Sequence, residues 1–248
     1  MLGIIANSIS ILLGATLGLI FHKKVNKDIS NNILKVVGVV VFFIGLLGII
    51  TSMVSVESGE GELLSHLTVQ YELELLIFLV LGMTIGCLLK INQHMVSFSM
   101  KIENKIQGEG FAKGFLNSSI VFSIGAMAII GSINAAVSHD NTLLYTKSLI
   151  DMVTAIVLAS ALGYGVLFSS IAVFVYQSIF YLLGLVLANF FQNIEFLNVF
   201  CAVGYAMVSC IGINFIMDNP KKEIKVANML PALLLIIIYY IFKIYIFG

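Results

Sequence analysis

The sequence contains no arginine, and all 13 of its basic residues are lysine. Arginine is the side chain best suited to forked recognition of phosphate groups, and 13 acidic residues bring the formal net charge to zero. The composition therefore gives no reason to expect a nucleic-acid partner.

Cysteine and histidine are also sparse. The three cysteines, Cys87, Cys201 and Cys210, fall within apolar segments and share no close metal-ligand spacing, and the four histidines form no H-x-x-H or H-E-x-x-H arrangement. Neither a nucleophile with a base nor a pair of carboxylates stands at a useful spacing. We therefore expect no metal, no other cofactor and no enzymatic activity.

Charged residues make up only 10% of the 248-residue chain, against 60% hydrophobic residues, and the mean hydropathy is +1.07. A water-soluble fold could not bury so much apolar surface. The apolar blocks are about 17 to 20 residues long, which is the length of a helix that crosses the hydrocarbon layer. Strands of a membrane barrel would alternate polar and apolar residues instead. We predict an all-α integral membrane protein, with residues 1–248 in one transmembrane domain surrounded by lipid.

Eight membrane spans are predicted from the apolar blocks. They lie at about 2–20, 36–53, 75–90, 115–133, 148–166, 170–190, 198–217 and 227–245. The first block is not typical of a signal peptide, because its positive charges, at Lys23 and Lys24, follow the apolar stretch instead of preceding it.

The lysines predict the orientation of these spans. Eleven fall on one side of the membrane, namely Lys23, Lys24, Lys27, Lys35, Lys90, Lys101, Lys105, Lys113, Lys221, Lys222 and Lys225. Only Lys147 and Lys243 fall on the other side, where a loop with Glu57, Glu60, Glu62, Glu72 and Glu74 contains no lysine. Because basic loops stay cytoplasmic, we expect both termini outside the bacterial inner membrane.

Residues 149–191 are almost continuously apolar and are interrupted only at Gly163-Tyr164-Gly165 and Ser169-Ser170. Two antiparallel helices with a tight turn would satisfy the backbone, and so would two half-helices whose broken ends line a cavity. A weak internal repeat is also predicted. Ala6-Asn7 at the start of the first span resembles Ala227-Asn228 at the start of the last.

Asp151 is the only acidic residue inside a predicted span, and an ionised carboxylate in hydrocarbon needs a partner or a hydrated cavity. Lys147 lies one helical turn earlier on the same face, with Ser148 and Thr154 within reach. Two interpretations remain open. The pair anchors the outer end of the fifth span, or it forms a cation or proton site near an external mouth.

Further candidates for a solute or ion pathway are polar residues within the spans. The fourth span carries Ser123 and ends in Gly131-Ser132-Ile133-Asn134, and a helix that stopped there would leave carbonyl groups free for a cation. Asn7, Tyr176, Gln177 and Asn228 complete the set. Small and polar residues at such spacings also serve helix packing, so both readings apply to each of them.

Several of these motifs together resemble a known family. Gly125 to Ile133, Lys147-Ser148-x-x-Asp151, Gly163-x-Gly165-Val166, Tyr176-Gln177 and Asn228 to Leu233 resemble the bacterial inner-membrane proteins grouped as domain of unknown function 554. The likeness extends over nearly the whole chain. It implies a polytopic bacterial membrane protein with a transport role and no established substrate.

The sequence departs from the pattern of that family at three places. The family usually has Asp-Gly where Asn134-Ala135 stands, and glycine where Met152 and Ser178 stand. Because the aspartate of that Asp-Gly pair is absent here, Asp151 is the stronger candidate for a functional carboxylate.

Two functions follow from these observations. The first is a secondary transporter or channel for a small solute or ion, with its intramembrane acid near the outer side. The second is a membrane-embedded regulatory or scaffold protein that acts through partners, although loops of about 20 residues leave little room for an interaction domain. Because so small a chain has few helices to enclose a pathway, we expect a homo-oligomer, most simply a dimer.

Overall fold

The computed structural model describes residues 1–22, 27–57, 66–106, 111–123, 126–191, 193–217, 219 and 222–246. The elements in chain order are α1 (Leu2–His22), α2 (Lys27–Met53), β1 (Val54–Glu57), β2 (His66–Val69), α3 (Glu72–Leu88), α4 (Ile91–Ile106), α5 (Phe111–Ser123), α6 (Ala126–Val137), α7 (Thr142–Leu162), α8 (Gly165–Phe191), α9 (Ile194–Met217), the 3-10 helix η1 (Val226–Met229) and α10 (Pro231–Ile246). The all-α prediction is confirmed, except for a small hairpin in which β1 pairs antiparallel with β2.

The long helices present large apolar side chains outward. Leu17 of α1, Leu47 of α2 and Val153 of α7 are among the exposed residues. A water-soluble protein rarely exposes apolar side chains over so wide a surface, whereas lipid accommodates them. By length and composition, six helices can cross a membrane, or up to eight if two bent helix pairs each count as one span.

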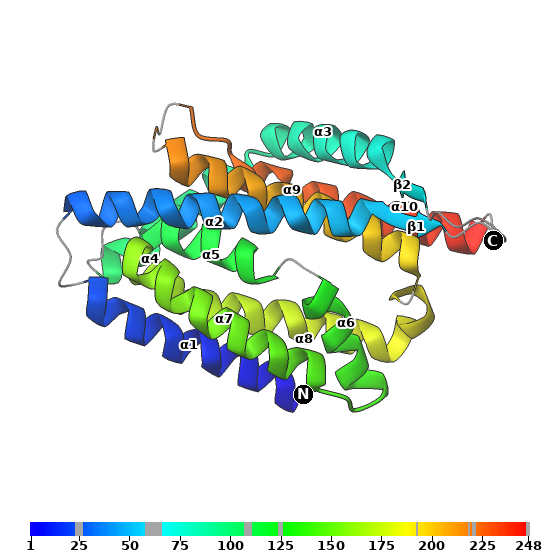
Figure 1. The fold of residues 1–248 in the computed structure, drawn as a ribbon, viewed down its shortest axis with the longest axis horizontal. Helices are drawn as coiled ribbons and strands as arrows, with labels where there is room; N and C mark the ends of the chain where they lie inside the picture. Colours follow the sequence, from blue (N-terminus) through cyan, green and yellow to red (C-terminus); the bar gives the residue numbers. More distant parts are fainter. Residues whose placement is uncertain are drawn as a thin grey trace.

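The helices form two groups that lie side by side in Figure 1. In the first helix group, α1 packs along α7, and α8 packs against α1, α5 and α6. In the second helix group, α2 packs along α9, and α3 packs against η1 and α10. Helix α2 also contacts α7, so the two groups share an interface through the middle of the molecule.

Glycines allow the closest helix contacts. Gly14 and Gly18 of α1 lie against the carbonyl oxygens of Met152 and Ile156 in α7, so any side chain on them would overlap that backbone. The numbering rises together along both helices, which shows that α1 and α7 run parallel. Without a hydrophobic force between helices in lipid, such close backbone approach is a main source of association.

The span predicted at 115–133 is formed by two helices with a bend between them. Helix α5 ends at Ser123, and the segment 127–137 continues at an angle of 60° to it. The Gly163-Tyr164-Gly165 interruption, in contrast, is the tight turn between two full-length helices. Gly163 has a φ of +75°, which a residue with a side chain rarely adopts, and the His22 ring bonds the nearby Ser160 carbonyl (2.8 Å).

A second bend separates α3 from the start of α4, at 57°. The segment around α4 was expected to be a loop, because its charged and amide side chains interrupt the apolar pattern. It forms a helix, and η1 packs into the corner between this helix and α3. The Asn92 backbone N–H donates to the Asn228 side-chain oxygen (2.7 Å), and Gly86 lies against the Asn228 backbone.

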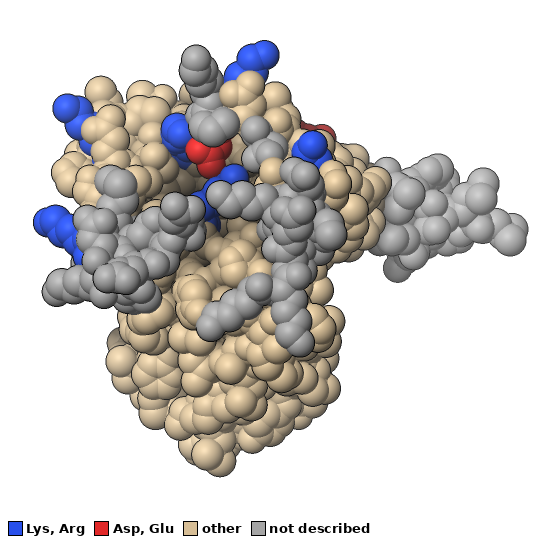
Figure 2. Space-filling view, turned by 90° about the vertical axis from the view of Figure 1, so that its left-hand side faces the viewer, with Lys and Arg blue, Asp and Glu red and all other residues tan. Residues whose placement is uncertain are grey.

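Lysines gather at one end of the bundle, which we call the lysine end. Figure 2 looks onto this end and shows lysine side chains spread across its described surface. The lysines there whose side chains the structure describes are Lys35, Lys90, Lys101, Lys113, Lys222 and Lys225. Lys27 and Lys105 lie on the described helices α2 and α4, whereas Lys23, Lys24 and Lys221 lie outside the described residues. At the opposite end, the hairpin end, lie the β1–β2 hairpin and the end of α10, whereas α1 begins nearer the middle of the long axis (Figure 1). Glu60 and Glu62 of the acidic loop also lie outside the described residues. The predicted internal repeat stays a prediction.

Candidate functional site

Helix α7 begins at Thr142, six residues before the predicted span, and this changes the depth of Asp151. The Asp140 carboxylate accepts hydrogen bonds from the Thr142 backbone N–H (2.9 Å) and hydroxyl (2.7 Å), which satisfy one free N–H group of the first turn and lower the pKa of Asp140. Asp151 is therefore the tenth residue of a 21-residue helix. It lies near the middle of α7, whereas the predicted span placed it close to a helix end, and its place near the outer side of the membrane stays a prediction.

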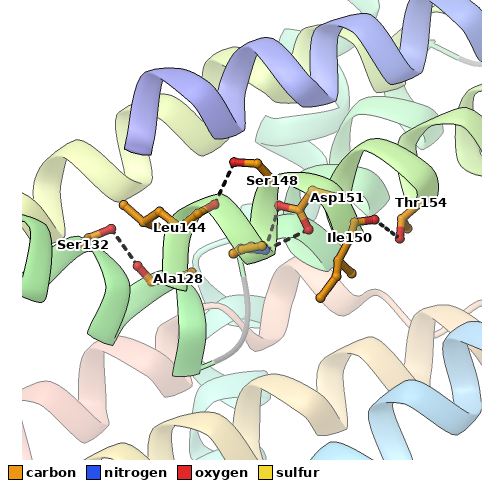
Figure 3. Close-up of polar contacts among 8 residues, drawn as sticks. Ala128, Ser132, Leu144, Ser148, Ile150, Asp151 and Thr154 are labelled. Carbon is orange, nitrogen blue, oxygen red and sulfur yellow. Dashed lines mark hydrogen bonds and ion pairs between the residues drawn. The ribbon is translucent and has the colours of Figure 1, made fainter. Parts of the chain in front are cut away.

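Asp151 forms a buried ion pair with Lys147, one turn earlier on α7. The Lys147 Nζ atom lies 2.9 Å from one carboxylate oxygen and 2.8 Å from the other, and both side chains are less than a tenth exposed. Figure 3 shows the pair, with the hydroxyls of Ser148 and Thr154 turned to their own helix, where they donate to the carbonyls of Leu144 and Ile150. The carboxylate is thus neutralised by a single ammonium group.

A cavity of about 270 Å³ lies beside this pair, at the interface of the two helix groups. We call it the central cavity. Its polar lining consists of Lys147, Asp151, Thr154 and Tyr205. Apolar side chains from α2, α5, α6 and α9, including Ile44, Phe122, Met127 and Val208, form much of the remaining wall.

A layer of polar side chains lies at a similar depth within the first helix group. Ile4, Ala135, Leu144 and Tyr181, from α1, α6, α7 and α8, form a separate apolar cluster toward the hairpin end, which we call the apolar plug. One helical turn deeper on the same four helices are Asn7, Ser132, Ser148 and Gln177, each at most 5% exposed. We call this set the polar layer.

Two members of the polar layer have unsatisfied amide groups. Ser132 and Ser148 donate to carbonyls of their own helices, at 2.6 and 2.7 Å. The side-chain nitrogen and oxygen of both Asn7 and Gln177 have no hydrogen-bond partner among the described residues. Asn7 nevertheless lies close enough to Asp151 to interact with its charge. Leaving a buried polar atom without a partner costs about 1–3 kcal/mol, so such groups mark places for water or a polar ligand.

A second cavity, of about 350 Å³, opens at the lysine end, and we call it the lysine-end cavity. Asn92, Lys113, Asn117 and Lys225 are among its polar residues. Ile120 lines this cavity and the next residue, Val121, lines the central cavity, so the two lie at successive depths along α5.

Asn214 of α9 shapes one wall of the lysine-end cavity. The Asn214 side chain accepts from the Ile224 N–H and donates to the Ile224 carbonyl, both at 2.8 Å. These two bonds hold the segment before η1 in a fixed position. Lys225 and Val226 are therefore presented to the cavity.

The remaining sequence candidates lie apart from the ion pair. The Tyr176 ring packs at a tilt against Phe180, with ring centroids 4.8 Å apart, and the Tyr176 hydroxyl is buried without a hydrogen-bond partner among the described residues. Ser123 ends α5 at the bend, and Asn228 binds the α3–α4 corner. The expected helix end at Asn134 is wrong, because α6 continues to Val137 and the Asn134 carbonyl accepts from the Ser138 N–H (2.9 Å).

Sequence reasoning missed Tyr205, which reaches the central cavity from α9, and the amides of the lysine-end cavity. Tyr205 lies in an apolar run where Ser209 is the one polar residue a turn away, and a lone serine is typical of helix packing, so no local signal marks Tyr205. Asn92 lies between two predicted spans, where a loop was expected. Asn117 lies in the fourth predicted span, whose small and polar residues also fit helix packing. Only the contact of α4, α5 and α9 brings their side chains to one cavity.

Several long helices that expose apolar side chains, one of them with a buried ion pair near its middle, define a polytopic membrane protein. The chain belongs to the family described as Protein of unknown function (DUF554), whose sequence model matches residues 2–241. This confirms the resemblance. The chain is also 27% identical to the "Uncharacterized membrane protein YdfK" of Bacillus subtilis (strain 168), over 100% of this chain and 99% of that one. No solved structure matches.

Proposed function

We propose that the protein is a secondary transporter or channel for a small solute or ion, and that Lys147 and Asp151 form its central site. The observation that carries this proposal is the buried ion pair near the middle of α7, in the wall of a cavity. Ionisable side chains at such depth are costly and commonly mark substrate or ion pathways. An ion pair that served packing alone would need no cavity beside it.

Polar groups at successive depths support a route through the bundle. The lysine-end cavity and the central cavity with its ion pair follow one another along α5. The polar layer lies at a similar depth, and the apolar plug closes the first helix group toward the hairpin end. This arrangement fits a state open toward the lysine end and closed toward the hairpin end.

The bent pair of α5 and α6 also supports transport. Its residues line both cavities, with Asn117 at the lysine-end cavity and Met127 at the central cavity. Broken helices at the interface of two bundles form the substrate sites of many secondary transporters. The bend places irregular backbone beside a cavity, where it is tolerated in a membrane.

Reconstituted transport tests the proposal. Purified protein in liposomes is assayed for charge movement and uptake against a panel of inorganic ions, amino acids and organic acids. We expect activity with one solute class and its loss in Asp151→Asn, because the variant removes the only carboxylate among the described residues that line the central cavity. Asp140→Asn is the matched control, since this carboxylate is exposed at the start of α7.

The alternative is a membrane-embedded regulatory or scaffold protein. Silence across the whole panel, from protein shown to be folded after reconstitution, would favour this alternative. Activity that persists unchanged in Asp151→Asn would leave a transporter whose site lies elsewhere. The expected homodimer stays a prediction.

We further infer that the lysine end faces the cytoplasm, with both termini outside the inner membrane, because lysine-rich ends stay cytoplasmic. The test uses right-side-out vesicles and a variant in which Cys87, Cys201 and Cys210 are replaced by alanine. A membrane-impermeant maleimide should label Asp140→Cys in intact vesicles and Lys101→Cys only after permeabilisation. Both positions are exposed, at opposite ends of the bundle, so the reverse pattern would contradict the inferred orientation.

A further inference from the structure

We propose that the central cavity takes a zwitterionic solute, a small molecule that carries one ammonium and one carboxylate group and an apolar side chain, as an α-amino acid does. The inference rests on the proposed function, because it names the solute class for the same site. Three features of the cavity carry it, namely its net charge, the spacing of its two charged groups and the nature of its remaining wall.

The first feature is the net charge of the site. Lys147 and Asp151 are less than a tenth exposed, and among the described residues that line the central cavity they are the only charged ones, so the site is neutral as a whole. A solute with a net charge would add one uncompensated charge to this buried place. Such a charge is strongly disfavoured at low dielectric, whereas a zwitterion leaves the sum at zero.

The second feature is the spacing of the two charged groups. They stand one turn apart on one helix, with Nζ 2.9 and 2.8 Å from the carboxylate oxygens. The ammonium and carboxylate of an α-amino acid are attached to one carbon and are therefore similarly close. Such a solute can replace the internal pair by two pairs of its own, with its carboxylate on Lys147 and its ammonium on Asp151.

The third feature is the rest of the wall. Ile44, Phe122, Met127 and Val208 offer apolar surface to a side chain, and Tyr205 adds a phenol group. A volume of about 270 Å³ admits one small solute and excludes a peptide of several residues. Apolar walls with a few polar anchors are the usual composition of small-molecule sites. We therefore expect an apolar side chain on the solute.

The experiment compares four molecules of nearly the same shape with the purified full-length protein. Leucine is the zwitterion, leucinamide the cation, N-acetylleucine the anion and N-acetylleucinamide the neutral analogue. Calorimetry measures binding, and counterflow in liposomes measures transport. We expect leucine to bind at least about 100-fold more tightly than the two charged analogues, since each of them leaves a buried charge unpaired.

Two variants then separate the roles of the charges. Asp151→Asn leaves Lys147 alone and should shift the preference from leucine to N-acetylleucine, whereas Lys147→Met should shift it to leucinamide. If either single variant does not fold, the double variant Lys147→Met/Asp151→Leu, which buries no charge, is expected to fold and to lose leucine binding. Leucine binding that the double variant retains would overturn the inference.

The outcomes distinguish this inference from the proposed function. Transport of an inorganic ion or a net-charged solute that is lost in Asp151→Asn would keep the proposed function and overturn the zwitterion. Binding of leucine and of all three analogues with equal affinity would also overturn it. Absence of binding by the series, together with silence across the wider panel, would overturn both.

Discussion

Replacing Lys147 by methionine should destabilise the folded protein by about 3–5 kcal/mol, because it leaves the Asp151 carboxylate buried without a counter-ion. Methionine keeps much of the side-chain volume, so the loss is electrostatic and little of it is a packing effect. Unfolding in mixed detergent micelles, followed by the loss of helical circular dichroism with denaturant, measures the change.

The control removes both charges. Lys147→Met/Asp151→Leu should regain most of the stability of the unmodified protein, since apolar replacement of a buried ion pair is often neutral or stabilising. The double-mutant cycle gives the coupling energy of the pair. A loss of less than about 1 kcal/mol in Lys147→Met would contradict this expectation and show that water in the central cavity solvates the Asp151 carboxylate.

Replacing Gly14 by alanine should separate α1 from α7. The added Cβ would overlap the Met152 carbonyl oxygen, which is helix backbone and cannot turn aside. Alanine is more favourable than glycine within a helix by about 1 kcal/mol, but overpacking a tight contact costs about 1–3 kcal/mol. The position of the polar layer also depends on the contact between α1 and α7. We expect a net loss of stability and a larger loss of transport, because Asn7 moves away from Asp151.

Gly131→Ala in α6 is the matched control. Its Cβ would meet the end of the Leu144 side chain, at 3.0 Å, and that side chain can shift. This variant should unfold close to the unmodified protein in the same denaturant titration. If Gly14→Ala proved as stable and as active as Gly131→Ala, close approach of α1 and α7 would not be required for the site.

Much of the architecture could be predicted from local features. Long apolar blocks indicated membrane helices, and the segregated lysines indicated which helix ends share one side. The i,i+4 spacing of Lys147 and Asp151 correctly predicted that they would pair, because residues four apart lie on one helix face.

The depth of Asp151 could not be predicted in the same way. Residues 142–147 include Thr142, Tyr145 and Lys147, so hydropathy favoured a loop there. They are helical because α1 packs against them. The Gly3 N–H donates to the Asn141 side chain (2.9 Å), and Leu144 is fully buried in the apolar plug. These long-range contacts extend α7 and move Asp151 to its centre.

The bend in the fourth span shows the same limit. Glycine occurs both near the α5–α6 bend and at the α7–α8 turn, and sequence reasoning placed the candidate for half-helices at the second. Packing of both α5 and α6 on α8 determines their directions, which no pattern within residues 111–137 reveals.

By itself, the sequence determined that this protein enters a membrane, approximately where its helices cross, and that one carboxylate must be neutralised there. These properties follow from sums over neighbouring residues, since each apolar or charged side chain adds its own transfer free energy to its helix. Only the tertiary structure decided that Asn7, Ser132, Ser148 and Gln177 share a depth near Asp151, and that a cavity adjoins the pair. The reason is that the relative offset of packed helices is set by contacts between residues more than a hundred positions apart, such as Gly14 with Met152.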